Sequence, residues 1–140
     1  MGKVVLRDVK ITVDSLDCSD HCTAVTVEDA AADVDSTAFG SVYTSAVKGL
    51  RTAQITATFQ QDFATGSLDA KFNTLNNQDT PFVVEVTPTS GTVGPANPKY
   101  RLPEAMLLGY TPLGGGVGDL STTDVTFSNA GASGVVRLTT

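Results

Sequence analysis

Ala53-Gln-Ile-Thr-Ala-Thr-Phe-Gln-Gln-Asp62 is the stretch that decides the fold, because apolar and polar residues alternate strictly over most of its length. Ile55, Ala57 and Phe59 fall on one side, which is the period of a β-strand with one buried face. The other side is polar but uncharged and consists of Gln54, Thr56, Thr58 and Gln60. A strand of this quality predicts that the chain is built on a β-framework.

The residues before this strand show no such alternation. Asp33-Val-Asp-Ser-Thr-Ala-Phe-Gly40 and the residues on to Gly49 are mostly small or polar, and the acidic run 28–35 has no apolar stripe that could dock as a helix. We therefore expect a long loop over about residues 30–50, and loops of this length usually contact partners. Gly49 is expected where the loop turns into the strand, at a position that tolerates no side chain.

Further segments alternate in the same way, and we predict strands around residues 9–13, 25–27, 82–86, 100–111, 125–127 and 136–138. Pro103 interrupts the segment 100–111, so the first half of that strand is expected at an edge or a bulge. Its apolar face is expected to hold Met106, Leu108 and Tyr110. The last two segments are expected to pair with each other as a hairpin.

One helix is predicted over about residues 67–76. Ser67 is placed to cap it, and Leu68, Phe72 and Leu75 lie at i, i+4 and i+7 on one apolar stripe. With seven or eight strands, the expected fold is mainly β, either a β-sandwich of two packed sheets or one strongly curved sheet, with this helix flanking it. A chain of 140 residues is expected to form a single domain, 1–140.

Charge and hydropathy exclude some functions. The net charge is -6 and the nine basic residues never form a run, which disfavours tight binding of nucleic acid. No apolar stretch approaches the length of a membrane span, and residues 1–20 carry charges where a signal peptide needs an unbroken apolar segment. We expect a chain that folds in a cytoplasm and has no membrane partner.

Cys18-Ser-Asp-His-Cys22 is the segment that most resembles a site for chemistry, since it contains ligand types that bind zinc. No other Cys or His exists to complete four ligands, and a disulfide across this short loop is disfavoured in a reducing cytoplasm. We interpret both cysteines as small buried hydrophobic residues beside a local turn. The glycine-rich segment 114–118 lacks the Lys-Ser/Thr of a phosphate-binding loop. No catalytic residue, metal or cofactor is predicted.

Several short motifs occur in an order that resembles the tail tube (major tail) proteins of long-tailed bacteriophages. They are Leu16-Asp-Cys-Ser-Asp-His21 before Val25-Thr-Val27, Asp35-Ser-Thr-Ala-Phe-Gly-Ser41, Gly49-Leu-Arg-Thr-Ala-Gln-Ile-Thr56, Phe59-Gln-Gln-Asp-Phe63 and Gly118-Asp-Leu-Ser-Thr-Thr-Asp-Val-Thr-Phe127. Each motif is short, and their order carries the specificity. The family has apolar residues where this chain has Cys18 and Cys22, which agrees with the buried interpretation.

The resemblance implies a structural virion protein and not an enzyme. It implies hexameric rings that stack into a tail tube, with the chain itself and other tail proteins as partners and genomic DNA passing without tight binding. It places the protein in the virion tail after synthesis in the cytoplasm of the bacterial host. The implied inter-ring contacts of the loop are Asp35, Thr37, Phe39, Tyr43 and Gly49. The implied barrel-wall residues are Gln54, Thr56, Thr58 and Gln60.

Two alternatives remain open at this point. A head decoration or tail-completion protein could use a similar sandwich, because a fold does not fix a function. A ligand-binding β-sandwich, for instance one that recognises carbohydrate, would need exposed aromatic residues. The chain has no Trp, and the available aromatic residues outside the predicted core are Phe39, Tyr43, Tyr100 and Tyr110.

Overall fold

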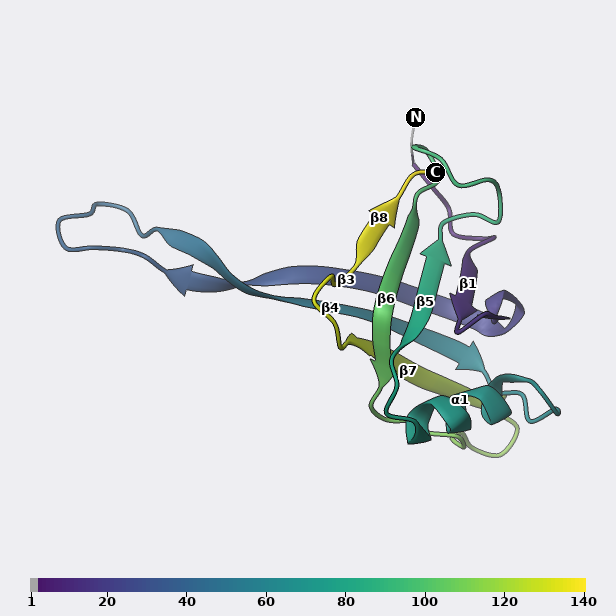
Figure 1. Ribbon diagram of the computed structural model, residues 1–140. Coiled ribbons are helices and arrows are strands. Elements are labelled where there is room, and N and C mark those ends of the chain that lie inside the picture. The colour runs from purple at the N-terminus through teal and green to yellow at the C-terminus, as the bar shows by residue number, and fades with distance from the viewer. Residues whose placement is uncertain (1–2) are drawn as a thin grey trace.

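The computed structural model describes residues 3–140, which form an eight-stranded antiparallel sheet and one α-helix (Figure 1). In chain order the elements are β1 (Lys10–Val13), β2 (Leu16–Asp17), a 3₁₀ turn η1 (Ser19–His21), β3 (Cys22–Asp35), β4 (Ala46–Gln60), α1 (Leu68–Asn77), β5 (Phe82–Thr87), β6 (Lys99–Leu107), β7 (Thr122–Asn129) and β8 (Val136–Leu138). The predicted mainly β fold with one flanking helix is confirmed.

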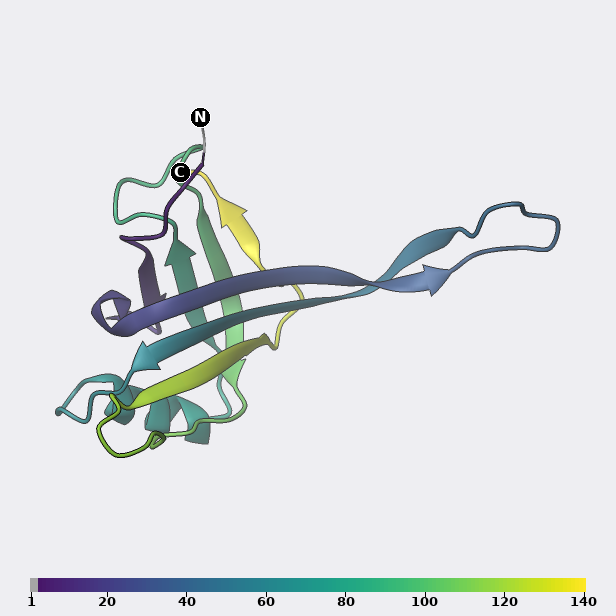
Figure 2. The same ribbon diagram turned by 180° about the vertical axis from the view of Figure 1, so that it is seen from behind.

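The sheet is strongly curved. Its strand order is β2-β1-β5-β6-β7-β4-β3, and β8 also pairs with β6. The front and back views show β1, β5, β6 and β8 in one layer and β3, β4 and β7 in the other (Figures 1 and 2). The apolar faces of the two layers meet to form the core, and α1 lies across one end of it (Figure 1).

The apolar stripe from which the helix was predicted packs α1 against the sheet. Leu68, Phe72 and Leu75 are all buried, as expected. The Phe72 ring lies 5.2 Å from Phe59 and 6.3 Å from Phe127, measured between ring centroids, so it joins α1 to β4 and β7. Each buried aromatic ring removes a large apolar area from water, so this cluster stabilises the attachment of α1.

Pro103 lies in a bulge of β6, which confirms the prediction made from the proline. Val84 pairs with Leu102 and Phe82 with Ala105, so Val83 faces two residues of β6 in place of one. The extra residue reverses the side on which later residues of the strand point. The predicted apolar face of Met106, Leu108 and Tyr110 is therefore wrong. Ala105 and Leu107 are buried, whereas Met106 is half-buried and Leu108 is exposed.

The predicted hairpin between the last two strands is also wrong. β8 pairs with the first half of β6, through Lys99–Arg101, and β7 pairs with the second half, through Ala105–Leu107. At its C-terminal end β7 already has β4 on one side and β6 on the other. No free edge remains there for β8, so the chain crosses to β6.

Within residues 3–140 the structure has no helix that is both long enough and apolar enough to cross a membrane.

Candidate assembly surfaces

The segment predicted as a loop over about residues 30–50 is mostly a paired β-hairpin, so that expectation is wrong in its extent. β3 continues to Asp35 and β4 begins at Ala46, and the two strands pair from Cys22↔Phe59 to Asp35↔Ala46. This hairpin leaves the body of the molecule as a long arm (Figures 1 and 2). The alternation is missing because both faces of the arm are exposed, so no core selects apolar residues there.

Gly49 lies within β4 and not where a loop turns into the strand, so a side chain is excluded there for a different reason than predicted. Ala31 pairs with Arg51 and Asp33 with Lys48, so Ala32 faces the two residues Gly49 and Leu50 across a bulge. A Cβ on Gly49 would lie 2.7 Å from Val34 Cγ2. The bulge brings the two strands close together, and a bulge of this kind increases the local twist of a hairpin.

The free end of the arm, residues 36–45, is closed by its own polar groups. The Thr37 N–H donates to Asp35 Oδ1 at 2.8 Å, and the Ser45 N–H donates to Thr37 Oγ1 at 2.8 Å. Hydrogen bonding to Thr37, through its side chain and then its N–H, lowers the pKa of the Asp35 carboxyl. Thr37 and Asp35 thus shape the end of the arm.

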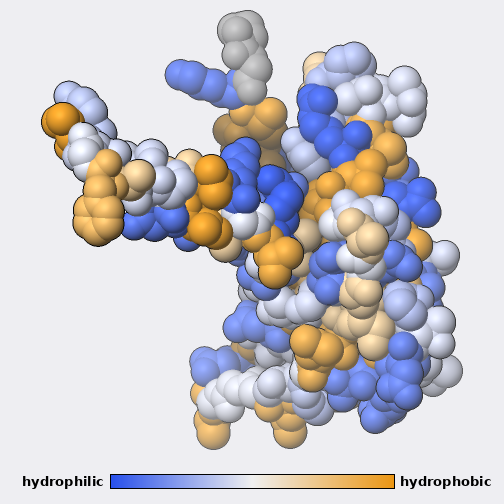
Figure 3. All heavy atoms as spheres, turned by 60° about the vertical axis from the view of Figure 1, so that its left-hand side comes forward, coloured by the Kyte–Doolittle hydropathy of each residue, from blue (hydrophilic) through white to orange (hydrophobic). Residues whose placement is uncertain are grey.

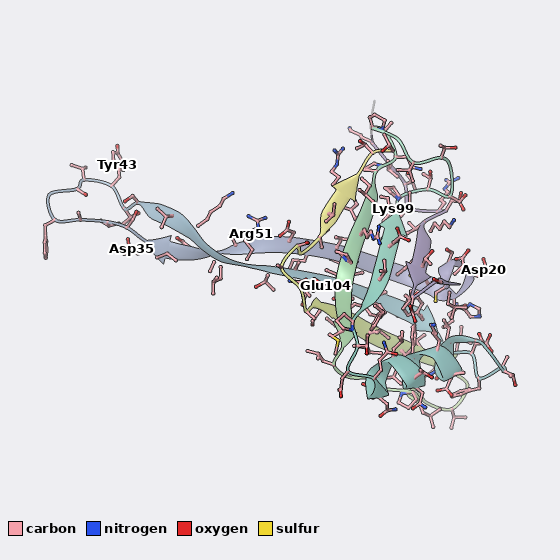
Figure 4. The ribbon with its side chains drawn as sticks, viewed as in Figure 1. Asp20, Asp35, Tyr43, Arg51, Lys99 and Glu104 are labelled. Carbon is pink, nitrogen blue, oxygen red and sulfur yellow. The ribbon has the colours of Figure 1, made fainter. Side chains whose placement is uncertain are left out.

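Apolar side chains at the end of the arm have no partner within the described part of the chain. Phe39 is fully exposed, and Val42 and Tyr43 are 91% and 84% exposed. Apolar residues stand out at the arm's free end in the space-filling view (Figure 3), and Tyr43 lies there far from the body (Figure 4). Val34, Val47 and Leu50 are exposed further along the arm. Such a set is the usual mark of a protein interface.

The polar face of β4 points away from the core and from α1. Gln54, Thr56, Thr58 and Gln60 are half-buried between mostly polar residues of the two neighbouring strands. The neighbours in register on that face are Ala24, Thr26 and Glu28 of β3 and Thr122, Asp124, Thr126 and Ser128 of β7. These rows contain two carboxylates and no Lys or Arg.

Both carboxylates on this face, which we call the wall face, are held by β4. Gln54 Nε2 donates to Glu28 Oε2 at 3.0 Å, and Thr58 Oγ1 donates to Asp124 Oδ1 at 2.6 Å. The cross-strand bonds fix the side chains in a flat polar layer. The wall face is therefore ordered, hydrophilic and negative.

The segment from Cys18 to Cys22 forms a turn. Both cysteines are free, and burial raises the pKa of the Cys18 thiol to about 12. His21 Nε2 lies 3.1 Å from Asp62 Oδ2, which ties the start of β3 to the residues before α1. Among residues 3–140 no group of three possible metal ligands comes together. The arrangement supports packing and turn roles for this segment.

Replacing Cys22 by Val should change the free energy of unfolding by less than about 1.5 kcal/mol, because Cys22 is a half-buried thiol beside the core. Urea denaturation of the two proteins measures the difference. A larger loss would mean that the thiol has a role that packing does not explain.

A second apolar surface lies where the two layers open beside the base of the arm. It is a groove of about 620 Å³ whose lining includes Val25, Val27, Val86, Tyr100 and Val135. Arg137 and Asp29 are its charged residues, and Asp29 is paired with Arg51 at 3.1 Å. Sequence reasoning missed this groove, because Val25 and Val27 carry the same alternation as fully buried strand residues.

The aromatic residues do not form a single exposed platform. Phe39 and Tyr43 lie on the arm, whereas Tyr100 lines the groove. The Tyr110 hydroxyl donates to Asp69 Oδ1 at 2.9 Å and accepts from Gln61 Nε2 at 2.8 Å, beside the Phe72 ring. Tyr110 thus supports the helix, and the residues considered for carbohydrate binding are separated.

Comparison with solved structures finds the same arrangement in parts of phage-like particles. A chain of the virion of a native gene transfer agent particle matches with a TM-score of 0.69 at 18% identity, over 92% of this chain and 95% of that chain. The PVC sheath-tube complex of an extracellular contractile injection system gives 0.71 at 9% identity, over 99% and 93%. The sheath/tube terminator of that system gives 0.72 at 12% identity, over 96% of each chain.

The fold is that of tail tube proteins. No protein-family model and no curated protein sequence matches the chain. The similarity therefore lies in the three-dimensional arrangement, and it confirms the predicted tail-tube fold. The neighbours are parts of a virion and of a contractile injection system.

Proposed function

We propose that this chain is the subunit of a phage-type tail tube, in which copies form hexameric rings that stack around a channel for the genome. The observation that carries the proposal is the arm, a paired hairpin that leaves the body and ends in exposed apolar side chains. A monomer gains nothing from such an element, whereas a subunit uses it to reach a neighbour. The tail-tube fold supports the same role.

The arm makes the contacts between rings. Thr37, Phe39 and Tyr43 belong to its free end, Asp35 is the last residue of β3 before it, and Gly49 lies at its bulge. Within a ring, the outer edge of β3 is the natural place for a neighbouring subunit, because β3 ends the strand order of the sheet. An open edge is an aggregation risk for a monomer and a subunit contact for a ring.

The wall face lines the channel. Its carboxylates, Glu28 and Asp124, repel phosphate groups, and its threonine and glutamine side chains offer no cation that would hold DNA. Genomic DNA then passes without tight binding. The protein acts in the virion tail with other tail proteins, after synthesis in the cytoplasm of the bacterial host.

Electron microscopy of the purified protein tests the proposal. Hollow tubes with six subunits in each ring are the expected result, and isolated globules under all assembly conditions would contradict it. A tail-completion role is the second candidate, since one structure with this fold is a sheath/tube terminator. Rings that never polymerise would favour that role.

Two lysines on the wall face should convert the channel into a DNA-binding surface. Thr56 and Thr126 are paired in register, so Thr56→Lys with Thr126→Lys places two cations side by side. We expect affinity of the tubes for short duplex DNA to rise about tenfold or more at low salt, with density inside the channel in reconstructions. Asn73→Lys with Asn76→Lys, on the exposed side of α1, is the matched control. DNA density that stays outside the channel in both variants would show that the wall face does not line it.

A further inference from the structure

We propose that the end of the arm inserts Phe39 and Tyr43 into the apolar groove of a second copy of this chain. The inference rests on the proposed function and identifies the surface that receives the arm. Its starting point is that residues 3–140 carry both exposed aromatic side chains and an open apolar groove.

The groove is a part of the core that remains partly exposed to solvent. At the other end of the two layers, α1 closes the core with Phe72, which is fully buried (Figure 1). At the groove, Val25, Val27 and Val135 are only half-buried, although they pack against the buried core cluster. An apolar side chain placed there would extend the core as Phe72 does. The groove has a volume of about 620 Å³, within the range of roughly 300–1,000 Å³ that is usual for ligand pockets.

The charges of the two surfaces are complementary. Residues 33–47, the outer part of the arm, include Asp33 and Asp35 and no Lys or Arg. Arg137 lines the groove and is exposed, and it forms no ion pair within the part of the chain that the structure describes. Asp29, the acidic residue of the groove, is already paired with Arg51. An acidic arm end therefore meets a basic site in the groove.

The occupant has to come from another copy. β3 lines the groove with Val25 and Val27 and continues without interruption to Asp35, so the arm's end lies roughly 25 Å or more from its own groove. The paired hairpin points away from the body (Figures 2 and 4). Contact between two different surfaces of one chain is head-to-tail, which produces a closed ring or a growing stack. Both outcomes suit a tube subunit.

Disulfide trapping between copies of the 140-residue chain tests the contact. In a Cys22→Val background, one copy carries Val42→Cys, which keeps Phe39 and Tyr43, and a tagged copy carries Val135→Cys in the groove. Under mild oxidation we expect a cross-linked heterodimer at least tenfold more abundant than with Thr126→Cys, which is exposed on the opposite, wall face. Equal yields with the two partners, or no cross-link to Val135→Cys, would overturn the proposal.

A charge placed at the aromatic position gives a second measurement. With Val42→Cys as the trapping residue, Phe39→Asp should abolish the cross-link to Val135→Cys. Ser41→Asp adds the same charge in the same loop and should leave most of the cross-link. Loss in both variants or in neither would overturn the role of Phe39. Circular dichroism is expected to be unchanged, because Phe39 is fully exposed.

The outcomes separate this inference from the proposed function. Tubes seen by electron microscopy without the cross-link between the end of the arm and Val135→Cys would contradict docking in the groove and leave the tail-tube function standing. Cross-linked dimers that never form tubes would contradict the tail-tube function and leave docking in the groove standing. A purified protein whose groove holds a tightly bound small apolar molecule, detected as added mass in native mass spectrometry of the assembled form, would also overturn the docking of the arm there.

Discussion

Replacing Phe72 by Ala is expected to lower the free energy of unfolding by about 3–5 kcal/mol. Phe72 is fully buried, and its ring contacts Phe59 and Tyr110 at 5.2 and 5.7 Å between centroids. The substitution removes the contact that joins α1 to the sheet and leaves a cavity at that end of the core. Domains of this size are stable by about 5–15 kcal/mol, so the loss is a large part of the total.

Urea denaturation of the unassembled protein, followed by circular dichroism, measures this loss. Asn76→Ala on the exposed side of the same helix is the control, and it should change stability by no more than about 0.5 kcal/mol. Phe72→Leu should fall between the two. If Phe72→Ala cost less than about 1.5 kcal/mol, α1 would not be the element that closes the core.

Gly49→Val is expected to disrupt assembly while leaving the body of the molecule folded. A Cβ at this position would lie 2.7 Å from Val34 Cγ2 and 3.4 Å from Ala32 Cβ, so either the Val34 side chain or the strand that carries it has to shift. Overpacking of this kind costs about 1–3 kcal/mol. If that strain falls on the contact between subunits, the concentration needed for assembly rises by about 5-fold to 150-fold. Sedimentation of tubes over a concentration series measures the change.

The short contact is with one side chain, which allows a rescue experiment. Gly49→Ala should impair assembly less than Gly49→Val, and combining Gly49→Ala with Val34→Ala should restore much of it, because the clashing Cγ2 is gone. Val34→Ala alone is the control for losing the valine. Unimpaired assembly of Gly49→Val would show that the twist of the arm is not needed, and a drop in its unfolding free energy would place the damage in the body.

Elements with one buried face could be predicted from the sequence. The alternation of Ile55, Ala57 and Phe59 and the helical stripe of Leu68, Phe72 and Leu75 identify residues that the structure buries. The reason is that a core selects apolar residues at the period of the element that faces it. The bulge at Pro103 could also be predicted, since proline cannot donate to the strand ladder.

The arm shows where this approach fails. Its two strands satisfy each other's backbone groups without burying a face, so Asp33, Val34 and Asp35 carry no periodic signal. The candidate contact residues lie in the arm, but the paired strands of the arm were not predicted. The available signal was the presence of isolated apolar residues, Val42, Val47 and Leu50, in a polar stretch. These residues can be recognised as exposed only once the arm is known to leave the body.

The sequence by itself determined the class of the fold, the helix and the strands with one buried face, because these follow from local periodicity and from the chemistry of single residues. Only the tertiary structure decided that β3 and β4 form a projecting arm, that β8 joins β6, and that the layers open into the apolar groove. Each of these depends on pairing between distant segments. A strand's partner is set by which backbone edges are still free when the sheet is complete, and no single stretch of residues carries that information.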